Sequence, residues 1–206
     1  MDLELLPSIV LEIARERSLD AVLGTIIGVV SRQHGVALAR LWLLENGDSC
    51  PHCAETDPSP ELALHLRASA GYMPEWGRTT GEFHWVPLDD GLKIGRIGKT
   101  GEAIRIADLS VDREWVRHPD WVREHGLVGF AGKPLLFRGE VLGVLGVFRT
   151  EAMSGDCWNW IGTLADAAAV AVANARAFEE AERLRKALEQ EREGEVVRAS
   201  ETARAA

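Results

Sequence analysis

The stretch GFAGKPLLFRGEVLGVLGVF, residues 129–148, decides the fold. Two apolar runs within it flank the turn RGE, residues 138–140, and this pattern predicts a tight antiparallel hairpin. The second run, VLGVLGVF, is apolar on both faces, so we expect a central strand that is covered on each side. Gly143 and Gly146 leave room for a close neighbour over that strand, either a packed helix or a ligand.

Three further strands are predicted upstream of this hairpin. Residues 36–44 and 62–70 are apolar runs separated by a turn and a proline-bearing loop, and residues 103–109 form the third run. Within the second of these runs, alternate residues are expected to share one face of the sheet, namely Leu62, Leu64, Leu66 and Ala68.

Helical spacing of apolar residues marks both ends of the chain. Residues 3–34 predict two helices, with Ser18 as the N-cap of the second and Gly35 as its stop. A long helix is predicted from about residue 156. Terminal helices with strands grouped between them indicate an α+β fold with an antiparallel sheet.

Composition narrows the class of protein. The chain has 206 residues, is 46% hydrophobic and carries a formal net charge of -9, so we expect a folded domain that does not bind nucleic acid directly. Its 3 cysteines favour a reducing compartment over a disulfide scaffold. The apolar runs are far shorter than the ~20 residues that cross a bilayer, and the acidic start MDLELLPS is no secretory signal. These features predict a cytoplasmic protein with no membrane partner.

The middle of the chain, residues 71–130, shows weak periodicity and four tryptophans. So long a stretch is expected to hold short helices and a binding surface. The tryptophans either cover a pocket or pack against one side of the sheet; they are Trp76, Trp85, Trp115 and Trp121.

The sharpest local motif is the pair Cys50 and Cys53, which is compatible with three interpretations. A thioredoxin-like redox site would need a helix, but a strand is expected next. A zinc site would need about four ligands, and the motif supplies two. We favour a surface loop whose two thiols form a disulfide on oxidation, and we assign no metal. The third cysteine, Cys157, is expected to be a buried thiol at the start of a helix.

Three segments taken in order resemble the GAF domain. They are GLKIGRIGKTGEAIRIADLSVD (91–112), the hairpin stretch at 129–148, and LADAAAVAVANARAFEEAERL (164–184). They resemble the family's glycine-punctuated helix that leads into a strand ending in Asp, its hairpin and its closing helix. More narrowly, the region around the hairpin is similar to the sensor GAF domains of sigma-54-dependent transcription activators and related signalling proteins.

The resemblance implies a GAF-like (PAS-like) central antiparallel sheet. The helices of both termini would lie on one face, and short helices and loops on the other would form a ligand-pocket layer. It implies a sensory domain over residues 1–185, with residues 186–206 as a C-terminal helical extension, coiled coil or linker. The terminal helices would pair in a homodimer and pass the ligand state to an output domain or protein.

The resemblance implies five residues at the positions where GAF domains build their pocket. Arg96 and Lys133 would hold an anion, and Trp121 and Phe130 would form apolar walls. Asp108 is the fifth candidate. The alternative for Arg96 and Asp108 is a surface or helix-capping role.

Known catalytic patterns are missing from the sequence. The stretch 95–100 lacks the first glycine of a phosphate loop, because that position is Lys93. Residues 71–132 hold no cysteine for a bilin or for methionine sulfoxide reduction. We therefore expect a non-enzymatic domain that senses an unidentified small molecule in transcriptional or two-component signalling, with no cofactor assigned. The alternative function is a redox-responsive thiol switch, or a thiol oxidoreductase, at the cysteine pair.

Overall fold

The computed structural model describes residues 6–47, 62–89, 91–111 and 116–205, with side chains as far as residue 194. One antiparallel sheet forms its centre, with strand order β3-β2-β1-β6-β5-β4. The strands are β1 (Val36–Glu45), β2 (Ala63–Gly71), β3 (Trp85–Val86), β4 (Ile104–Ile106), β5 (Gly129–Phe137) and β6 (Glu140–Arg149).

The predicted hairpin is confirmed at the middle of this sheet. Strand β6 pairs with β5 on one side and β1 on the other, which makes it a central strand. Arg138 and Gly139 join β5 to β6 with φ of 53° and 85°. Positive φ at both positions is the geometry of the two-residue hairpin turn whose twist matches the strands.

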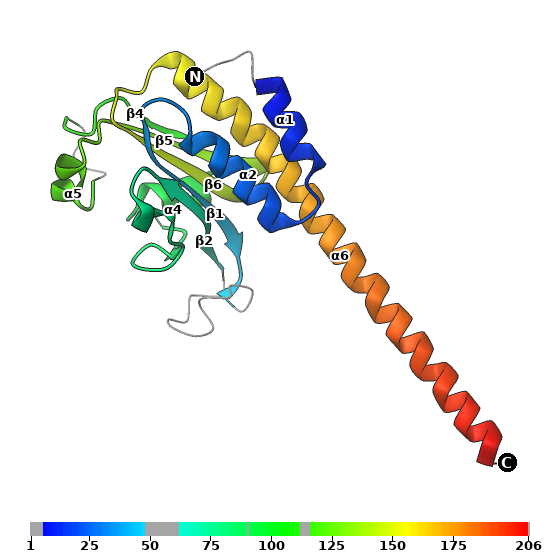
Figure 1. The fold of residues 1–206 in the computed structure, drawn as a ribbon. Coiled ribbons are helices and arrows are strands. Elements are labelled where there is room, and N and C mark those ends of the chain that lie inside the picture. The colour runs from blue at the N-terminus through cyan, green and yellow to red at the C-terminus, as the bar shows by residue number, and fades with distance from the viewer. Residues whose placement is uncertain (1–5, 48–61, 90, 112–115, 206) are drawn as a thin grey trace.

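Three helices cover one face of the sheet, which we call the helix face (Figure 1). They are α1 (Leu6–Arg15), α2 (Leu19–Ser31) and α6 (Gly155–Ala205). Ser18 caps α2 as predicted, because its hydroxyl oxygen accepts a hydrogen bond from the Ala21 amide at 3.2 Å. Gly35 lies beyond the end of this helix, in the turn into β1 with φ of 75°. The terminal helices therefore form one layer, as the resemblance implied.

The opposite face, called the cavity face below, carries a layer of short elements. They are η2 (Pro74–Gly77), α4 (Lys93–Thr100) and α5 (Pro119–Glu124). A second apolar core fills the space beneath them, with Trp42, Ile97 and Phe130 among its buried members. The sheet is thus covered on both faces, and the α+β prediction is confirmed.

One predicted face assignment is wrong. Leu64 and Leu66 belong to the core of the cavity face, but Ala68 packs into the core of the helix face. The cause is a bulge in β2, because Leu41 pairs with Ala68 whereas the next residue, Trp42, pairs with Leu66. A bulge inserts one extra residue and reverses which side chains face each side. The strand predicted at 103–109 is also shorter in the structure, where β4 spans Ile104–Ile106. Leu109, the last residue of the predicted strand, lies beyond β4 and packs in the core of the cavity face.

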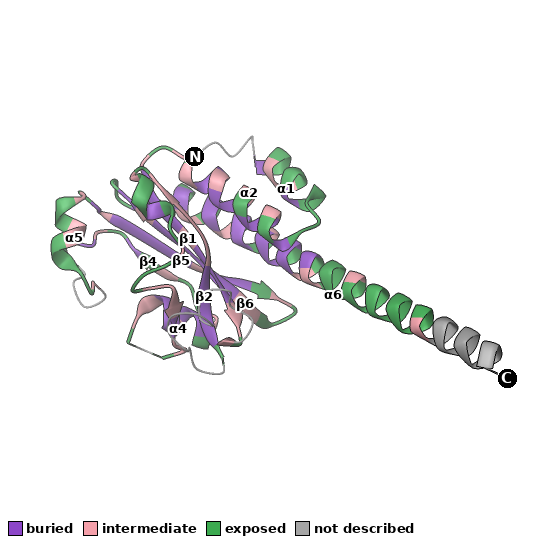
Figure 2. Cartoon of the chain, turned by 60° about the horizontal axis from the view of Figure 1, so that its bottom comes forward, coloured by how far each residue is buried: buried purple, intermediate pink, exposed green. Residues whose placement is uncertain are grey.

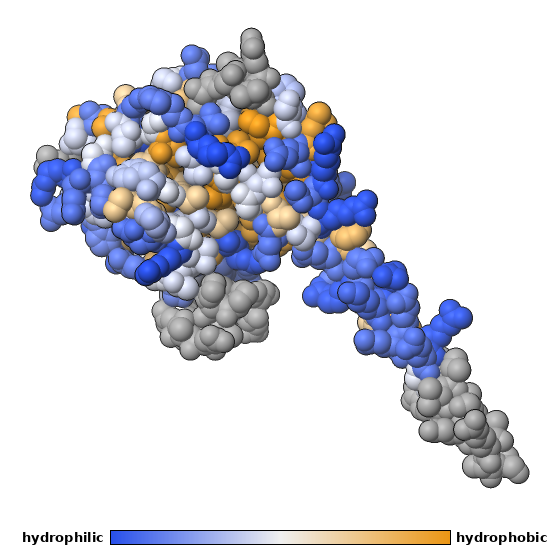
Figure 3. Space-filling model, in the orientation of Figure 1, coloured by the Kyte–Doolittle hydropathy of each residue, from blue (hydrophilic) through white to orange (hydrophobic). Residues whose placement is uncertain are grey.

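Helix α6 extends well past the sheet (Figure 1). Its 51 residues correspond to about 77 Å at 1.5 Å per residue. One side of the part beside the sheet is buried, whereas the described side chains farther along the helix are mostly exposed (Figure 2) and largely hydrophilic (Figure 3). Within the described residues, no helix is both apolar enough and long enough to span a bilayer.

Candidate functional site

A cavity of about 460 Å³ lies between the cavity face of the sheet and the short helices above it. This volume falls within the range of small-molecule pockets. Its walls are mostly apolar, with cationic and aromatic side chains among them. The lining residues are Leu38, Arg40, Trp42, Leu66, Trp76, Thr80, Glu82, Phe83, Val86, Leu92, Lys93, Ile94, Leu109, Val116, Arg117, His118, Trp121, Val122 and Phe148.

Strand β1 forms the floor of the cavity. Leu38, Arg40 and Trp42 are alternate residues, so all three lie on the cavity face. The Trp42 indole N–H donates to the Phe83 carbonyl oxygen at 3.0 Å, which fixes the ring against the cavity layer. The floor therefore places one charged side chain, Arg40, between two apolar ones.

Arg40 has little compensation for its charge. Its Nε donates to the Ser69 hydroxyl oxygen at 3.4 Å, and that hydroxyl in turn donates to the Trp76 carbonyl oxygen. The bulge in β2 makes this contact possible, because it brings Ser69 onto the cavity face opposite Arg40. Burial lowers the pKa of the Arg40 guanidinium below its ordinary value.

An aromatic cluster forms one wall. The Trp121 ring lies 5.2 Å from Trp76 and 5.8 Å from Phe148, measured between ring centroids, and meets Phe148 edge to face. Tyr72 and His125 extend the cluster around Trp76 at 4.7 Å and 4.9 Å. Tilted and edge-to-face pairs at these separations are favourable aromatic contacts.

The rim of the cavity carries an exposed charge cluster. The Glu82 carboxylate lies 3.4 Å from Arg117 Nε and 3.1 Å from His118 Nε2. Lys93, at the start of α4, also lines the cavity, and its ammonium lies 5.0 Å from the centroid of the Phe130 ring and 5.8 Å from that of Phe148.

The structure brings one of the five predicted ligand residues to the cavity. Trp121 lines it. Phe130 lies just outside the lining, fully buried with its ring 4.9 Å from Phe148. Arg96 is on α4, two residues beyond the last cavity-lining position of that helix, and does not reach the cavity.

Asp108 and Lys133 lie elsewhere. Asp108 accepts hydrogen bonds from the Ser110 hydroxyl at 2.6 Å and the Ser110 amide at 2.8 Å, which lower the pKa of the Asp108 carboxyl. This is a local surface turn, in line with the surface alternative, and no helix of the described residues begins there. Lys133 is on the helix face, with its ammonium 3.3 Å from the centroid of the Trp158 ring on α6. Burial lowers the pKa of the Lys133 ammonium.

Sequence reasoning missed Arg40 as a site residue. A signal was present, because Arg40 is the one charged residue within the apolar run VALARLWLL at 36–44. Charged residues are rarely buried in strands without a partner or a purpose. The sequence does not reveal which face of the sheet this position takes.

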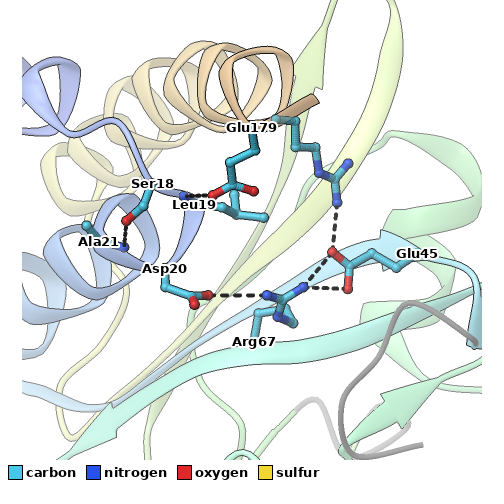
Figure 4. A network of polar contacts seen from close by, with 8 residues as sticks. Ser18, Leu19, Asp20, Ala21, Glu45, Arg67 and Glu179 are labelled. Carbon is cyan, nitrogen blue, oxygen red and sulfur yellow. Dashed lines mark hydrogen bonds and ion pairs between the residues drawn. The ribbon is translucent and has the colours of Figure 1, made fainter. Parts of the chain in front are cut away.

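A polar network joins the far end of β1 to the helices (Figure 4). The Glu45 carboxylate accepts from Arg67 at 2.7 and 2.8 Å and from Arg176, on α6, at 3.2 Å. Arg67 also reaches Asp20 on α2 at 3.2 Å. The strand that forms the cavity floor is thus tied directly to α6.

The cysteine interpretations are resolved only in part. Cys50 and Cys53 lie outside the described residues. Cys157 is buried in the first turn of α6, as predicted, and its amide donates to the Ser154 hydroxyl oxygen at 3.2 Å. In the part of the chain with described coordinates, no three His, Cys, Asp or Glu side chains gather as a metal site.

Comparison with known proteins finds a family and several solved structures that share this architecture. The GAF domain family model matches residues 18–172. The GAF domain from Acinetobacter phosphoenolpyruvate-protein phosphotransferase is similar, with a TM-score of 0.62 and 24% identity over 85% of this chain and 94% of that chain. Residues 122 to 287 of a methyl-accepting chemotaxis protein have a TM-score of 0.60 and 19% identity over 82% and 97%. Among proteins of curated function, none matches the sequence at a significant level.

The expectation of a non-enzymatic domain is overturned by another of these structures. Free methionine-R-sulfoxide reductase from Neisseria meningitidis, in complex with its substrate, has a TM-score of 0.60 and 18% identity over 84% of this chain and 89% of that chain. The same fold therefore supports catalysis, and the missing motifs did not exclude it. Because the family match spans most of the chain, and the sheet, helix layer and cavity layer are all present, the chain belongs to the GAF domain family, a family of sensing and signalling domains.

Proposed function

We propose that this GAF domain binds a small molecule in the cavity over its sheet and reports the occupancy of that cavity through its terminal helices. The observation that carries the proposal is the cavity of about 460 Å³, lined by apolar and aromatic side chains with a few charged groups among them. A largely preformed apolar pocket with a few polar groups is the usual form of a ligand site.

A physical route from the cavity to the helices supports the proposal. Strand β1 supplies the cavity floor through Leu38, Arg40 and Trp42, and its last residue, Glu45, bonds to Arg176 on α6. A ligand that prefers one position of β1 would shift the population of α6 positions by its difference in affinity. Such couplings are typically about 1–3 kcal/mol.

The output in this proposal is a pair of α6 helices in a homodimer. Leu184 and Leu188 are exposed on α6, and their spacing puts them on one side of the helix. Residues 1–185 would then be the sensory domain and 186–206 the C-terminal helical extension, and the pairing seam would cross the boundary between them. We place this module in transcriptional or two-component signalling, a role favoured by the fold it shares with a methyl-accepting chemotaxis protein.

Native mass spectrometry of the full chain, purified without added ligand, tests the sensing function. We expect an additional mass under native conditions that disappears on denaturation, and a rise in melting temperature when the released compound is added back. A chain that retains nothing and is not stabilised by any member of a metabolite library would contradict the proposal and favour a dimerisation scaffold.

Light scattering on the full chain tests the output. We expect a dimer for the wild type and a monomer for the double variant Leu184→Glu/Leu188→Glu, because two carboxylates would have to enter the apolar seam. The matched control is Lys186→Glu, which makes this part of α6 more negative by the same two charges but leaves both leucines. A wild-type monomer at high micromolar concentration would refute helix pairing.

A further inference from the structure

Among the described residues that line the cavity, basic side chains outnumber acidic ones, whereas the chain as a whole is negative. Arg40, Lys93 and Arg117 line the cavity, whereas Glu82 is the single carboxylate among its described lining residues. Glu82 is at the exposed rim, where it pairs with Arg117 and His118. Arg40, on the cavity floor, therefore contributes a positive charge that pairs with no carboxylate of the described lining, in a molecule with a net charge of -9.

The Arg40 guanidinium is the positive group in the cavity that would gain most from a bound anion. Its guanidinium is half-buried on the cavity floor, and its partner is a neutral hydroxyl, that of Ser69, at 3.4 Å. No carboxylate in the described part of the chain forms an ion pair with it. Guanidinium carries several N–H donors in a planar fork that matches a carboxylate, and most of them are left for a ligand here.

The walls specify the rest of the ligand. Trp76, Trp121 and Phe148 give a continuous aromatic surface, and Leu38 and Leu66 add apolar area on the floor. Ring contacts of this kind favour an aromatic body over a polar one. A strongly hydrated anion without an apolar part would leave these walls in contact with water.

We infer that the cavity takes an aromatic carboxylate, with its carboxylate held by Arg40 and its ring against the wall formed by Trp76 and Trp121. This inference rests on the proposed function and names the chemical class of its ligand. In the empty protein, a half-buried guanidinium without a carboxylate partner lowers stability, and a bound carboxylate would offset this cost.

Matched acids and amides test the inference on the full chain. The probes are benzoate, phenylacetate and 3-phenylpropionate, each with its neutral primary amide, and the readouts are melting temperature and tryptophan fluorescence. We expect at least one acid to bind the wild type clearly more tightly than its amide. Amides that bind as tightly as their acids would overturn the inference and leave the proposed function standing.

Substitutions of Arg40 locate the effect. We expect Arg40→Met to bind the acids about 10- to 100-fold more weakly, the loss that follows removal of a charge-assisted hydrogen bond, with Arg40→Lys in between. The matched control is Arg123→Met on α5, which removes an exposed guanidinium paired with Asp120 outside the cavity lining and should bind like the wild type. Equal losses in both variants would overturn the role of Arg40.

A measurement without any ligand keeps the inference falsifiable. Empty Arg40→Met should melt at or above the temperature of the empty wild type, because a desolvated cation is removed. A clearly lower melting temperature for empty Arg40→Met would show that Arg40 stabilises the fold, and it would overturn the inference. A native mass that identifies a neutral retained compound would also overturn it, whereas a cavity that retains nothing and binds none of the probes would overturn both the inference and the proposed function.

Discussion

Substituting alanine for Gly95 tests how closely α4 packs against the backbone of the segment that precedes it. Gly95 is buried in α4, two residues after Lys93 and next to Ile94, which both line the cavity. A Cβ at this position would meet the Pro87 carbonyl oxygen closer than real Cβ atoms come, and the Asp89 carbonyl oxygen at 2.9 Å. Both obstacles are backbone atoms, so neither can rotate away.

The expected loss follows from two opposing effects. Alanine is favoured over glycine in a helix interior by about 1 kcal/mol. Forcing an extra group into a tightly packed site costs about 1–3 kcal/mol, and the upper end applies because two backbone carbonyls are involved. Gly95→Ala should therefore lower the free energy of unfolding by about 2 kcal/mol, or the melting temperature by about 4–8 °C for a chain of this size.

The same substitution at Gly24 is the control. Gly24 is in the interior of α2, and no atom lies within 4 Å of where its Cβ would be. Gly24→Ala should therefore raise the melting temperature by about 2–4 °C. Thermal and urea denaturation measure both variants. If Gly95→Ala were as stable as Gly24→Ala, the close approach of α4 to the segment before it would be refuted.

Two more predictions concern a pH dependence and a predicted site residue. Burial lowers the pKa of His65 below its ordinary value of 6.5, so the unfolded chain takes up more protons as the pH falls below that value, and the free energy of unfolding should decrease from about pH 8 to about pH 5. Denaturation across this range should show that the free energy of unfolding depends less on pH in His65→Gln, and an unchanged slope would contradict the role of His65. Because Lys133 faces α6, Lys133→Met should leave ligand affinity unchanged, whereas Trp121→Ala should weaken it. Calorimetry with the retained compound measures both affinities, and a loss in Lys133→Met but not in Trp121→Ala would show that Lys133 contacts the ligand.

The candidate site was predictable only in outline. The length and weak periodicity of residues 71–130 correctly indicated short helices, although Trp115 of this stretch lies outside the described residues. Of the predicted ligand residues, Trp121 lines the cavity, whereas Lys133 lies on the helix face. Alternation along a strand separates two faces without saying which face the terminal helices cover, so Lys133 could be assigned to a ligand on sequence grounds and still lie under α6.

The sequence by itself determined the elements and their order. The β5–β6 hairpin follows from a short turn between apolar runs, the cap of α2 from Ser18, and the cover on both faces of β6 from its apolar run VLGVLGVF. These features depend on neighbours within a few residues, and local backbone preferences and periodicity act over that range.

Only the tertiary structure decided what the cavity contains. Arg40 faces the ligand space because the sheet turns that side of β1 away from the helices, and Ser69 meets it because a bulge in β2 shifts the register by one residue. The Glu45 network likewise joins residues more than a hundred positions apart. Such contacts depend on how distant strands and helices pack, and this information is spread over the whole chain rather than carried by any short motif.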